Sequence, residues 1–562
     1  MKELFIRMQG SKALAGEILV ASLFVNLLFL ASPIFVIQIL SRYIGYGFDG
    51  TLYTLTTGMV IAVVLNVGFS LVRMRMCAAL SVEPDMAWQT SVHEALTKVQ
   101  YMALHSFSRN KIQQLVAAPR VIQAAFESQR VSAVLDMPFY LIFILAIYLI
   151  SPLLALITLT ATVVSMLTAY VNSSHINKVD EALRKESMGH SSSMLSAINS
   201  IESVRIHGAG PFLLSLWKNQ YAAIGAIRNS VLHSRSWTAA LMQGLSALLK
   251  VAIYAVGAKL VVSGSLSVGA LIGVSILSAK ALHISSGFMQ AVQIMGKAKA
   301  AQELISEFSQ LPHERENASH PPDFSGQMAL QDISIMFEGQ TGPLIESLTL
   351  PIPSGSVLGI IGKNGTGKTT LCKMLVGLVE PTRGQLLIGG VDLRQISSDW
   401  WRSQIMYVPQ EPMFIDGTFR DNIIMSAQDI DTADLDEIIR LADLKRYLDA
   451  SLRGLDSLVV DGGKTLPVGI RKRLGLARAL VGGGKVAIFD EPTDGLDKEG
   501  CQAVYTVLNI LRKRGVTIVV VSQDPNIIQG YNKIIDLDSK PVPRVAVVKV
   551  GSDERHGKAG DA

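Results

Sequence analysis

The sequence holds little cysteine and little charge, and each shortage excludes a class of protein. Three cysteines occur, Cys77, Cys372 and Cys501, and their spacing is not that of metal ligands. We therefore expect free, buried thiols in a reducing compartment. Charged residues make up 17% of the chain and hydrophobic residues 49%, which favours membrane spans over a fully soluble protein. The net charge of +5 gives no support for a nucleic-acid partner.

The N-terminus lacks a signal-peptide pattern. Lys2, Arg7 and Lys12 precede a long apolar segment, but no small-residue cleavage site closes a short apolar stretch. The first apolar segment is therefore expected to remain in the chain as a membrane span.

Six apolar segments are candidates for crossing a bilayer, which takes about 20 residues. They are residues 18–40, 52–72, 137–150, 153–171, 238–262 and 268–287. The third is short, so its start is placed either at residue 137 or nearer Val131. Residues 73–130 and 172–235 are polar but keep helical spacing of apolar residues, and we expect long helices that extend into the cytoplasm.

The distribution of Lys and Arg predicts the orientation in the membrane. The N-terminus and both long connections carry many such residues, and the short connections carry few. By the positive-inside rule, the N-terminus, the long connections and the chain after the sixth span face the cytoplasm. Lys259, near a span end, is expected to snorkel, whereas Lys250 lies deeper and either snorkels or lines a polar pathway. Asn26, Asn66 and Gln243 are expected to form hydrogen bonds between helices.

A proline-rich linker at residues 311–326 separates this half from a soluble one. Beyond the linker, short apolar strands alternate with helices, which is typical of an α/β domain. We expect strands at residues 328–337, 347–352, 357–361, 485–489 and 516–521. The predicted organisation is a membrane domain over 1–310, the linker, an α/β domain over 327–545 and a flexible tail over 546–562, with loose order beginning after Asp538.

A glycine-rich loop in the α/β domain has the pattern of a phosphate-binding loop. The motif G-x-x-x-x-G-K-[ST] runs from Gly362 to Thr369, between an apolar strand and a helix that starts at Lys368. Its backbone N–H groups and the helix N-terminus are suited to hold phosphate oxygens. Lys368 is expected to reach the β- and γ-phosphates, and Thr369 to hold Mg²⁺. The loop residues expected to bind the nucleotide are Gly362, Asn364, Gly365, Thr366, Gly367, Lys368, Thr369 and Thr370.

Two carboxylates follow another apolar strand in this domain. We expect Asp490 to bind Mg²⁺, directly or through water, and Glu491 to polarise the attacking water as general base. Gln410 is either a ligand of Mg²⁺ or water, or a surface glutamine. Phe337 either stacks on an adenine ring or packs in the core.

These motifs, in this order, resemble those of the ABC transporter superfamily over nearly the whole chain. Residues 362–369 resemble its Walker A motif, Gln410 its Q-loop, residues 488–491 its Walker B motif with the catalytic glutamate, and residues 493–497 its D-loop. Phe337 stands where the family has an adenine-stacking aromatic. Six spans before one nucleotide domain match the half-transporter plan of ABC exporters. The first span, at residues 21–36, is similar to the type I secretion branch of hemolysin and protease exporters.

The resemblance implies a six-helix all-α transmembrane domain followed by an α/β P-loop nucleotide-binding domain that uses ATP and Mg²⁺. It implies a dimer with a second half-transporter, in which each ATP lies between one subunit's Walker A motif and the other's signature loop. It also implies a bacterial inner membrane, a periplasmic adaptor, an outer-membrane channel and an exported protein. Membrane lipid is then the surrounding partner, and nucleic acid is not a partner. Some relatives carry an N-terminal peptidase domain, but the first span here begins too early to expect one.

Two departures from the family pattern concern the γ-phosphate. The signature L-S-G-G-Q is represented by residues 466–470, L-P-V-G-I, which keep the N–H group of Gly469 and a helix start for contact with phosphate. Gln523 replaces the switch histidine and cannot carry its positive charge. Loss of one such donor costs on the order of 3 kcal/mol in the barrier. We therefore expect slow ATP hydrolysis in a homodimer, with Glu491, Gln523 and Gln410 as the catalytic residues.

Three alternatives to a protein exporter remain open. The chain can be the degenerate half of a heterodimer whose partner has an intact signature, and the cargo can be a small molecule or a lipid. It can also be a regulatory subunit that binds ATP without turnover. The six spans argue against a soluble ABC ATPase.

Overall fold

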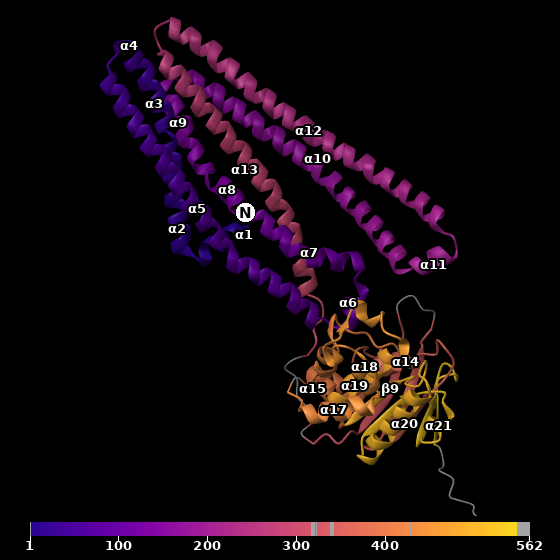
Figure 1. The fold of residues 1–562 in the computed structure, drawn as a ribbon. Coiled ribbons are helices and arrows are strands. Elements are labelled where there is room, and N and C mark those ends of the chain that lie inside the picture. Colours follow the sequence, from indigo (N-terminus) through magenta and orange to yellow (C-terminus); the bar gives the residue numbers. More distant parts are fainter. Residues whose placement is uncertain (1, 316–320, 322, 338–341, 428, 548–562) are drawn as a thin grey trace, which may run out of the picture. The chain divides into compact units, whose positions relative to one another are not determined.

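The computed structural model describes residues 2–315, 321, 323–337, 342–427 and 429–547. The chain forms two compact units, coloured along the sequence in Figure 1. The first comprises Met1–Thr97 and Phe107–Leu311, and the second comprises Lys98–Ser106 and Pro312–Ala562. Each unit has its own hydrophobic core.

The first unit is entirely helical. Its helices are α1 (Lys2–Gly10), α2 (Lys12–Phe29), α3 (Ala31–Gln38), α4 (Ile44–Tyr46), α5 (Asp49–Lys98), α7 (Arg109–Ala125), α8 (Ser128–Leu135), α9 (Tyr140–Ile150), α10 (Pro152–Asn199), α11 (Ile201–Ile206), α12 (Gly210–Val262) and α13 (Val268–Ser309). A π-helical turn, Ile39–Tyr43, joins α3 to α4, and a 3₁₀ turn, Met137–Phe139, joins α8 to α9. The long polar stretches are thus helical, as predicted.

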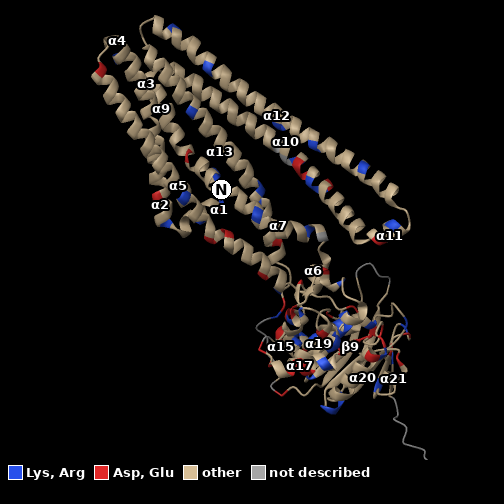
Figure 2. Cartoon of the chain, in the orientation of Figure 1, with Lys and Arg blue, Asp and Glu red and all other residues tan. Residues whose placement is uncertain are grey.

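Six helical segments among the described residues are long and apolar enough to cross a membrane, which confirms the predicted number. The third runs over Ser128–Ile150, so the earlier of its two predicted starts is the better one. The break before the fourth is where expected, because α10 begins with Pro152 at the first helical position, where its missing N–H group costs nothing. Figure 2 shows long uncharged stretches on these helices and dense charge of both signs over the second unit.

Helix α13 is the central helix of the first unit. It packs against α3, α7, α9, α10 and α12, and α10 also lies along α12 (Figure 1). Contact with α3 requires small residues, because a Cβ atom added at Gly269 would lie 2.9 Å from the carbonyl oxygen of Ile37. The core between these helices is apolar and includes Phe143, Ile147 and Val274.

Asn26 and Asn66, two of the three polar residues expected to join helices, do so in the structure. The Nδ2 group of Asn26 donates to Asp136 at 2.7 Å, and that of Asn66 donates to the carbonyl oxygen of Val25 at 3.1 Å. Arg73 donates to the same Asp136 oxygen at 2.7 Å and is 8% exposed. Gln243 is exposed on α12.

The second unit is an α/β domain with three sheets. The strands are β1 (Met328–Ile335), β2 (Ile345–Ile352), β3 (Val357–Ile361), β4 (Arg383–Ile388), β5 (Val391–Asp392), β6 (Ile405–Val408), β7 (Gly417–Thr418), β8 (Leu458–Val459), β9 (Val486–Asp490), β10 (Thr517–Val521), β11 (Lys533–Asp536) and β12 (Arg544–Val547). The central sheet has the order β12-β11-β3-β10-β9-β6 and is parallel except for β12. An antiparallel sheet has the order β2-β1-β4-β5, and β7 pairs with β8.

Nine helices accompany these sheets in the described part of the unit. They are α6 (Tyr101–Ser106), α14 (Lys368–Leu375), α15 (Ser398–Ser403), α16 (Phe419–Ile424), α17 (Thr432–Leu441), α18 (Lys445–Ala450), α19 (Val468–Val481), α20 (Lys498–Lys513) and α21 (Pro525–Ile528). Strands β3, β9 and β10 are almost wholly buried, which matches their continuous apolar sequences.

Two expectations from the sequence are wrong. The chain after Asp538 is not uniformly loose, because β12 pairs antiparallel with β11 from Asp536↔Arg544 to Lys533↔Val547. The short run R-V-A-V supplies β-branched residues for this edge strand. Of the tail predicted over 546–562, residues 546 and 547 belong to β12, and residues 548–562 lie outside the described residues. Cys77 and Cys372 are buried free thiols as expected, whereas Cys501 is only half-buried.

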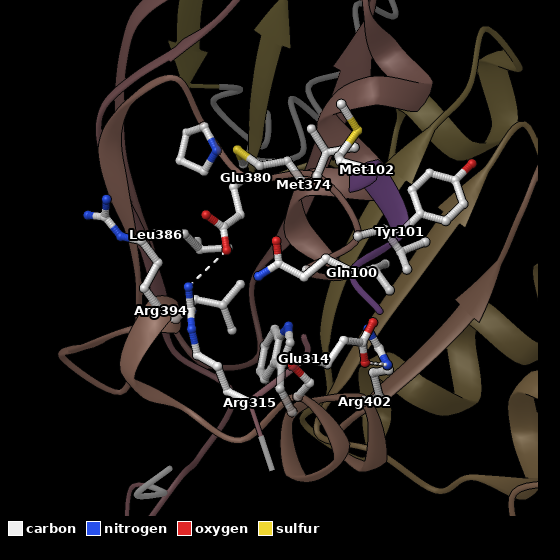
Figure 3. A pocket seen from close by; sticks show the side chains of 18 of the residues that line it. Gln100, Tyr101, Met102, Glu314, Arg315, Met374, Glu380, Leu386, Arg394 and Arg402 are labelled. Atoms are coloured by element: carbon white, nitrogen blue, oxygen red, sulfur yellow. Dashed lines mark hydrogen bonds and ion pairs between the residues drawn. The ribbon is translucent and has the colours of Figure 1, made fainter. Parts of the chain in front are cut away.

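Lys98–Ser106 belongs to the second unit, which its helical sequence pattern did not indicate. Val99 forms a β-bridge with His313, and the backbone N–H of Gln100 donates to the carbonyl oxygen of Pro312 at 2.9 Å. The Nζ group of Lys373 lies 3.4 Å from the Tyr101 hydroxyl. Figure 3 shows Tyr101 among the side chains that line a neighbouring cavity. This segment and the side chains of Met374, Leu386 and Trp401 line a common cavity of about 300 Å³. We call Lys98–Ser106 the docking segment.

We predict that Asp136→Ala destabilises the first unit by about 3 kcal/mol, because it leaves the Arg73 guanidinium buried without its carboxylate. The matched control is Glu307→Ala, which breaks an ion pair with Lys111 whose side chains are 49% and 55% exposed. That change is expected to cost less than about 0.5 kcal/mol. Thermal unfolding of the purified chain in detergent compares the two, and equal losses would contradict the assignment.

Candidate nucleotide site

The glycine-rich loop lies at the carboxyl edge of the central sheet, between β3 and α14. Three of its glycines have φ angles that favour glycine, namely 149° at Gly362, 82° at Gly365 and 103° at Gly367. Gly367 is the N-cap of α14 and offers no side chain to the first-turn N–H groups. These groups have no acceptor within the helix, so they are directed at the space in front of the loop. The loop therefore has the form of an anion cradle.

The Lys368 ammonium bridges the loop from inside. Its Nζ atom donates to the carbonyl oxygens of Gly362 at 2.7 Å and Lys363 at 3.2 Å, and it lies 3.5 Å from Glu491 Oε1. Only 7% of the residue is exposed. A phosphate in the cradle would meet a cation that is already oriented, which lowers the reorganisation needed on binding.

Asp490, at the end of β9, is a buried carboxylate without a hydrogen-bond partner. It is 1% exposed, and neither of its oxygens is bonded to any described atom. Burial raises the pKa of this carboxyl, and the neighbouring Thr369 hydroxyl and Lys368 charge oppose that effect only in part. An unpaired buried carboxylate beside a threonine hydroxyl is a donor set that suits Mg²⁺. Among the described residues, no group of three or more His, Cys, Asp or Glu side chains is arranged to hold a metal ion.

Glu491 has an unusual backbone conformation that Val521 and Lys472 hold in place. Its φ angle is 48°, its N–H donates to Val521 at 2.9 Å, and its carbonyl oxygen accepts from the Lys472 ammonium at 2.8 Å. The side chain is fixed as well, because Gln410 Nε2 donates to Glu491 Oε2 at 3.1 Å. The carboxylate thus faces both Lys368 and Gln410, where it can accept a proton from a water.

A cavity of about 830 Å³ gathers most of the predicted site residues. Those that line it are Phe337, Asn364, Gly365, Gly367, Lys368, Thr369, Thr370, Gln410, Glu491 and Gln523. Gly362 and Thr366 belong to the loop but do not line the cavity, and Asp490 is buried at the end of β9. Phe337 is half-buried; one part of it packs on the core and another lines the cavity.

Gly469 lies away from this cavity, in the first turn of α19. A Cβ atom added there would lie 3.2 Å from a guanidinium nitrogen of Arg473. Pro467 is the N-cap of α19 and offers no side-chain hydrogen bond, and both it and Val468 are exposed. The signature segment therefore presents a bare helix start to its surroundings.

Several residues that support the site were missed by sequence reasoning. Lys472 is 7% exposed and anchors the Glu491 carbonyl group, although the basic run 471–473 gave no sign of this role. The segment after β11 braces the loop: Asp538 Oδ1 accepts from the Lys363 N–H at 2.7 Å, and Lys540 Nζ donates to the Thr366 carbonyl at 2.9 Å. Gln523 Nε2 lies 3.5 Å from the Gly362 carbonyl oxygen.

Two family models together match most of the chain. The ABC transporter transmembrane region matches residues 16–282, and the ABC transporter domain matches residues 345–494. The chain belongs to the ABC transporter family. This confirms the resemblance, and the predicted combination of a helical transmembrane domain and an α/β nucleotide-binding domain is confirmed too. As a family member, the chain binds ATP and is an ATP hydrolase coupled to transmembrane transport.

Relatives place this ABC transporter among exporters with fused domains. It is 24% identical to the leukotoxin translocation ATP-binding protein LktB of Mannheimia glucosida over 534 residues, which is 93% of this chain and 74% of that protein. It is also 24% identical over 535 residues to the alpha-hemolysin translocation ATP-binding protein HlyB of Escherichia coli O157:H7, with the same coverage. Its fold matches a bacterial Atm1-family ABC exporter with ATP bound, at a TM-score of 0.82, 18% identity and 94% coverage of both chains. The chain is an exporter half-transporter and a multi-pass membrane protein.

We predict that Asp490→Asn stabilises the ATP-free chain by about 2 kcal/mol at neutral pH, because the buried carboxylate has no partner. The raised pKa means that the folded state binds the proton more tightly than the unfolded chain, so the ionised group subtracts from stability at pH 7. The same variant is expected to lose the further stabilisation that ATP gives in the presence of Mg²⁺.

Thermal unfolding with and without ATP and Mg²⁺ measures both effects. Asp494→Asn is the control, since Asp494 lines the same cavity but is exposed. A lower unfolding temperature for the ATP-free Asp490→Asn variant would contradict the assignment.

Proposed function

We propose that this chain is the inner-membrane ATPase and permease of a type I protein secretion system and acts as a dimer. The observation that carries the proposal is the joint presence of a hydrolytic set and six spans in one chain. That chain aligns over 93% of its length with proteins named for translocating leukotoxin and hemolysin. The N-terminus, the long helical connections and the ATP-binding unit face the cytoplasm, in accord with the positions of Lys and Arg.

Each residue of the site has a role in this proposal. The loop N–H groups and Lys368 hold the phosphates, Phe337 stacks on adenine, and Thr369, Asp490 and Gln410 would hold Mg²⁺. Bound Mg²⁺ would neutralise charge that develops on the phosphate oxygens. Glu491 accepts the proton of the attacking water, which Gln410 helps to orient. Because Lys472 fixes the Glu491 backbone, it acts as a positioning residue.

The separation of Gly469 from the cavity supports the proposed dimer. The partly exposed first turn of α19 can contribute its N–H groups to the ATP held by the partner's loop, and the partner reciprocates. Closure of two such sites on ATP drives the exchange between inward- and outward-open states. A periplasmic adaptor and an outer-membrane channel would carry the exported protein onward.

Both ATP sites of a homodimer are weakened. Pro467 removes the serine hydroxyl of the signature, Ile470 removes its amide, and Gln523 replaces a group that can be a cation. Slow turnover is the expected result. The same defects favour a second candidate, in which this chain is the degenerate half of a heterodimeric small-molecule or lipid exporter. A regulatory subunit that only binds ATP is the third, and it fits the intact Glu491 less well.

We predict that restoring the signature and the switch raises steady-state ATPase activity of the purified chain by about tenfold to a hundredfold. The variant combines Pro467→Ser, Val468→Gly, Ile470→Gln and Gln523→His. The physical reason is the return of a hydroxyl, an amide and an imidazole to the γ-phosphate.

Glu491→Gln in the restored chain is the control, and it is expected to remove the gain. Equal rates in the native and restored chains would show that the native signature is not defective.

We predict that Glu491→Gln, introduced into the native chromosome, depletes one or a few proteins from the culture medium while they accumulate in the cytoplasm. Quantitative proteomics of both fractions measures this, with Lys368→Ala as a second inactive variant and Glu499→Gln, an exposed residue in the first turn of α20, as the control. An unchanged set of secreted proteins would refute protein secretion, and a changed content of small molecules or lipids would favour the second candidate.

A further inference from the structure

A cavity of about 710 Å³ lies among three helices of the membrane unit. It is bounded by Phe29 at the end of α2, by Lys250 and Tyr254 of α12, and by Ser275, Ile276, Ala279, Lys280 and His283 of α13. These helices belong to three of the six candidate spans. None of the lining residues is acidic, whereas three of them are basic.

The two lysines lie equally far along their helices from the short connection between α12 and α13. Helix α12 ends at Val262 and α13 begins at Val268, and Lys250 and Lys280 each lie roughly three turns from these ends. Three turns is about 16 Å, which is beyond the reach of a lysine side chain to the end of its helix. Lys250 is equally far from the other end of its predicted span, at residue 238, and Lys280 lies about two turns from the other end of its span, at residue 287. Snorkelling therefore does not explain Lys250, and it would require Lys280 to reach about 10 Å. Lys259, by contrast, is within one turn of the end of α12.

No carboxylate neutralises these lysines. Neither Lys250 nor Lys280 forms an ion pair in the part of the chain that the structure describes. The charged neighbour Asp136 is already held by Arg73 and Asn26, each at 2.7 Å. Lys280 is half-buried, with its ammonium 4.7 Å from the centre of the Phe29 ring, and Lys250 and His283 are exposed toward the cavity.

Unpaired cations at this depth require water or an anionic partner in the cavity, because exposure to hydrocarbon is costly. We propose that the cavity binds carboxylates of the transported polypeptide as it crosses the membrane unit, an inference that rests on the proposed export of a protein. Lys250 and Lys280 pair with the carboxylate, Tyr254 and His283 supply hydrogen bonds, and Phe29 forms the apolar wall. The position of Lys250 argues for cargo over lipid, since it lies about three turns from both ends of its predicted span and a lipid phosphate stays at the membrane surface.

The test uses the full chain in nanodiscs of neutral phosphatidylcholine, without ATP. Two fluorescent peptides of equal length serve as probes, one with glutamate at the positions where the other has glutamine. Fluorescence anisotropy gives their dissociation constants. We expect the glutamate peptide to bind about tenfold more tightly, as for a charge pair that is partly shielded from water.

Four variants locate the preference. Lys280→Gln and Lys250→Gln are each expected to reduce it to less than about threefold, and Lys280→Arg is expected to keep it, because the charge is retained. Lys259→Gln is the matched control on the same helix and is expected to keep it as well. Equal binding of the two peptides, or an equal loss in the Lys259→Gln variant, would overturn the proposal.

A second arm separates cargo from lipid. The measurement is repeated in nanodiscs that contain phosphatidylglycerol, together with native mass spectrometry of retained lipid. Loss of the glutamate preference, with lipid retained by the native chain but not by Lys280→Gln, would show that a lipid phosphate occupies the cavity and would overturn the proposal. The binding data are independent of the proteomic test above, so failure of secretion and failure of the carboxylate site are distinguishable.

Discussion

The conformation of Glu491 is the constraint on which the nucleotide site depends. A residue other than glycine with a φ angle of 48° carries about 1 kcal/mol of backbone strain, which the surroundings must offset. A strand partner at Val521 holds the N–H group, and a buried ammonium at Lys472 holds the carbonyl group. This backbone conformation directs the Glu491 carboxylate toward Lys368 and Gln410 rather than along the direction of β9. The strand order brings β3, β10 and β9 together, so the phosphate cradle and this carboxylate share one edge of the sheet.

Much of this arrangement could be predicted from the sequence, because the signals are local. The strand before Gly362 and the helix after it are continuous in sequence, and β3 has the predicted bounds, residues 357–361. The membrane spans could also be predicted, because each is a nearly uninterrupted run of apolar residues. The end of α12 at Val262 and the start of α13 at Val268 are where the sequence placed them.

The parts that escaped prediction depend on partners far away in the chain. Strand β12 is four residues long and follows two prolines, so only its pairing with β11 makes it a strand. Lys472 and Lys540 look like ordinary surface lysines until the fold places a carbonyl oxygen opposite each ammonium. The docking segment reads as part of a long polar helix, yet its hydrogen bonds are made with residues 312–314, more than 200 positions later.

Because of the docking segment, the linker is not the only connection between the two units. The polypeptide crosses between the two units at three places, near residues 97, 106 and 311, rather than at one. A protein cut at the linker would lose the strand-like partner of His313 and uncover the apolar side chains of Met374, Leu386 and Trp401 that now face Tyr101 and Met102. Recombinant fragments of the catalytic half would therefore expose an apolar surface that favours aggregation. A peptide with the sequence of the docking segment, added separately, would be expected to bind this surface and cover it.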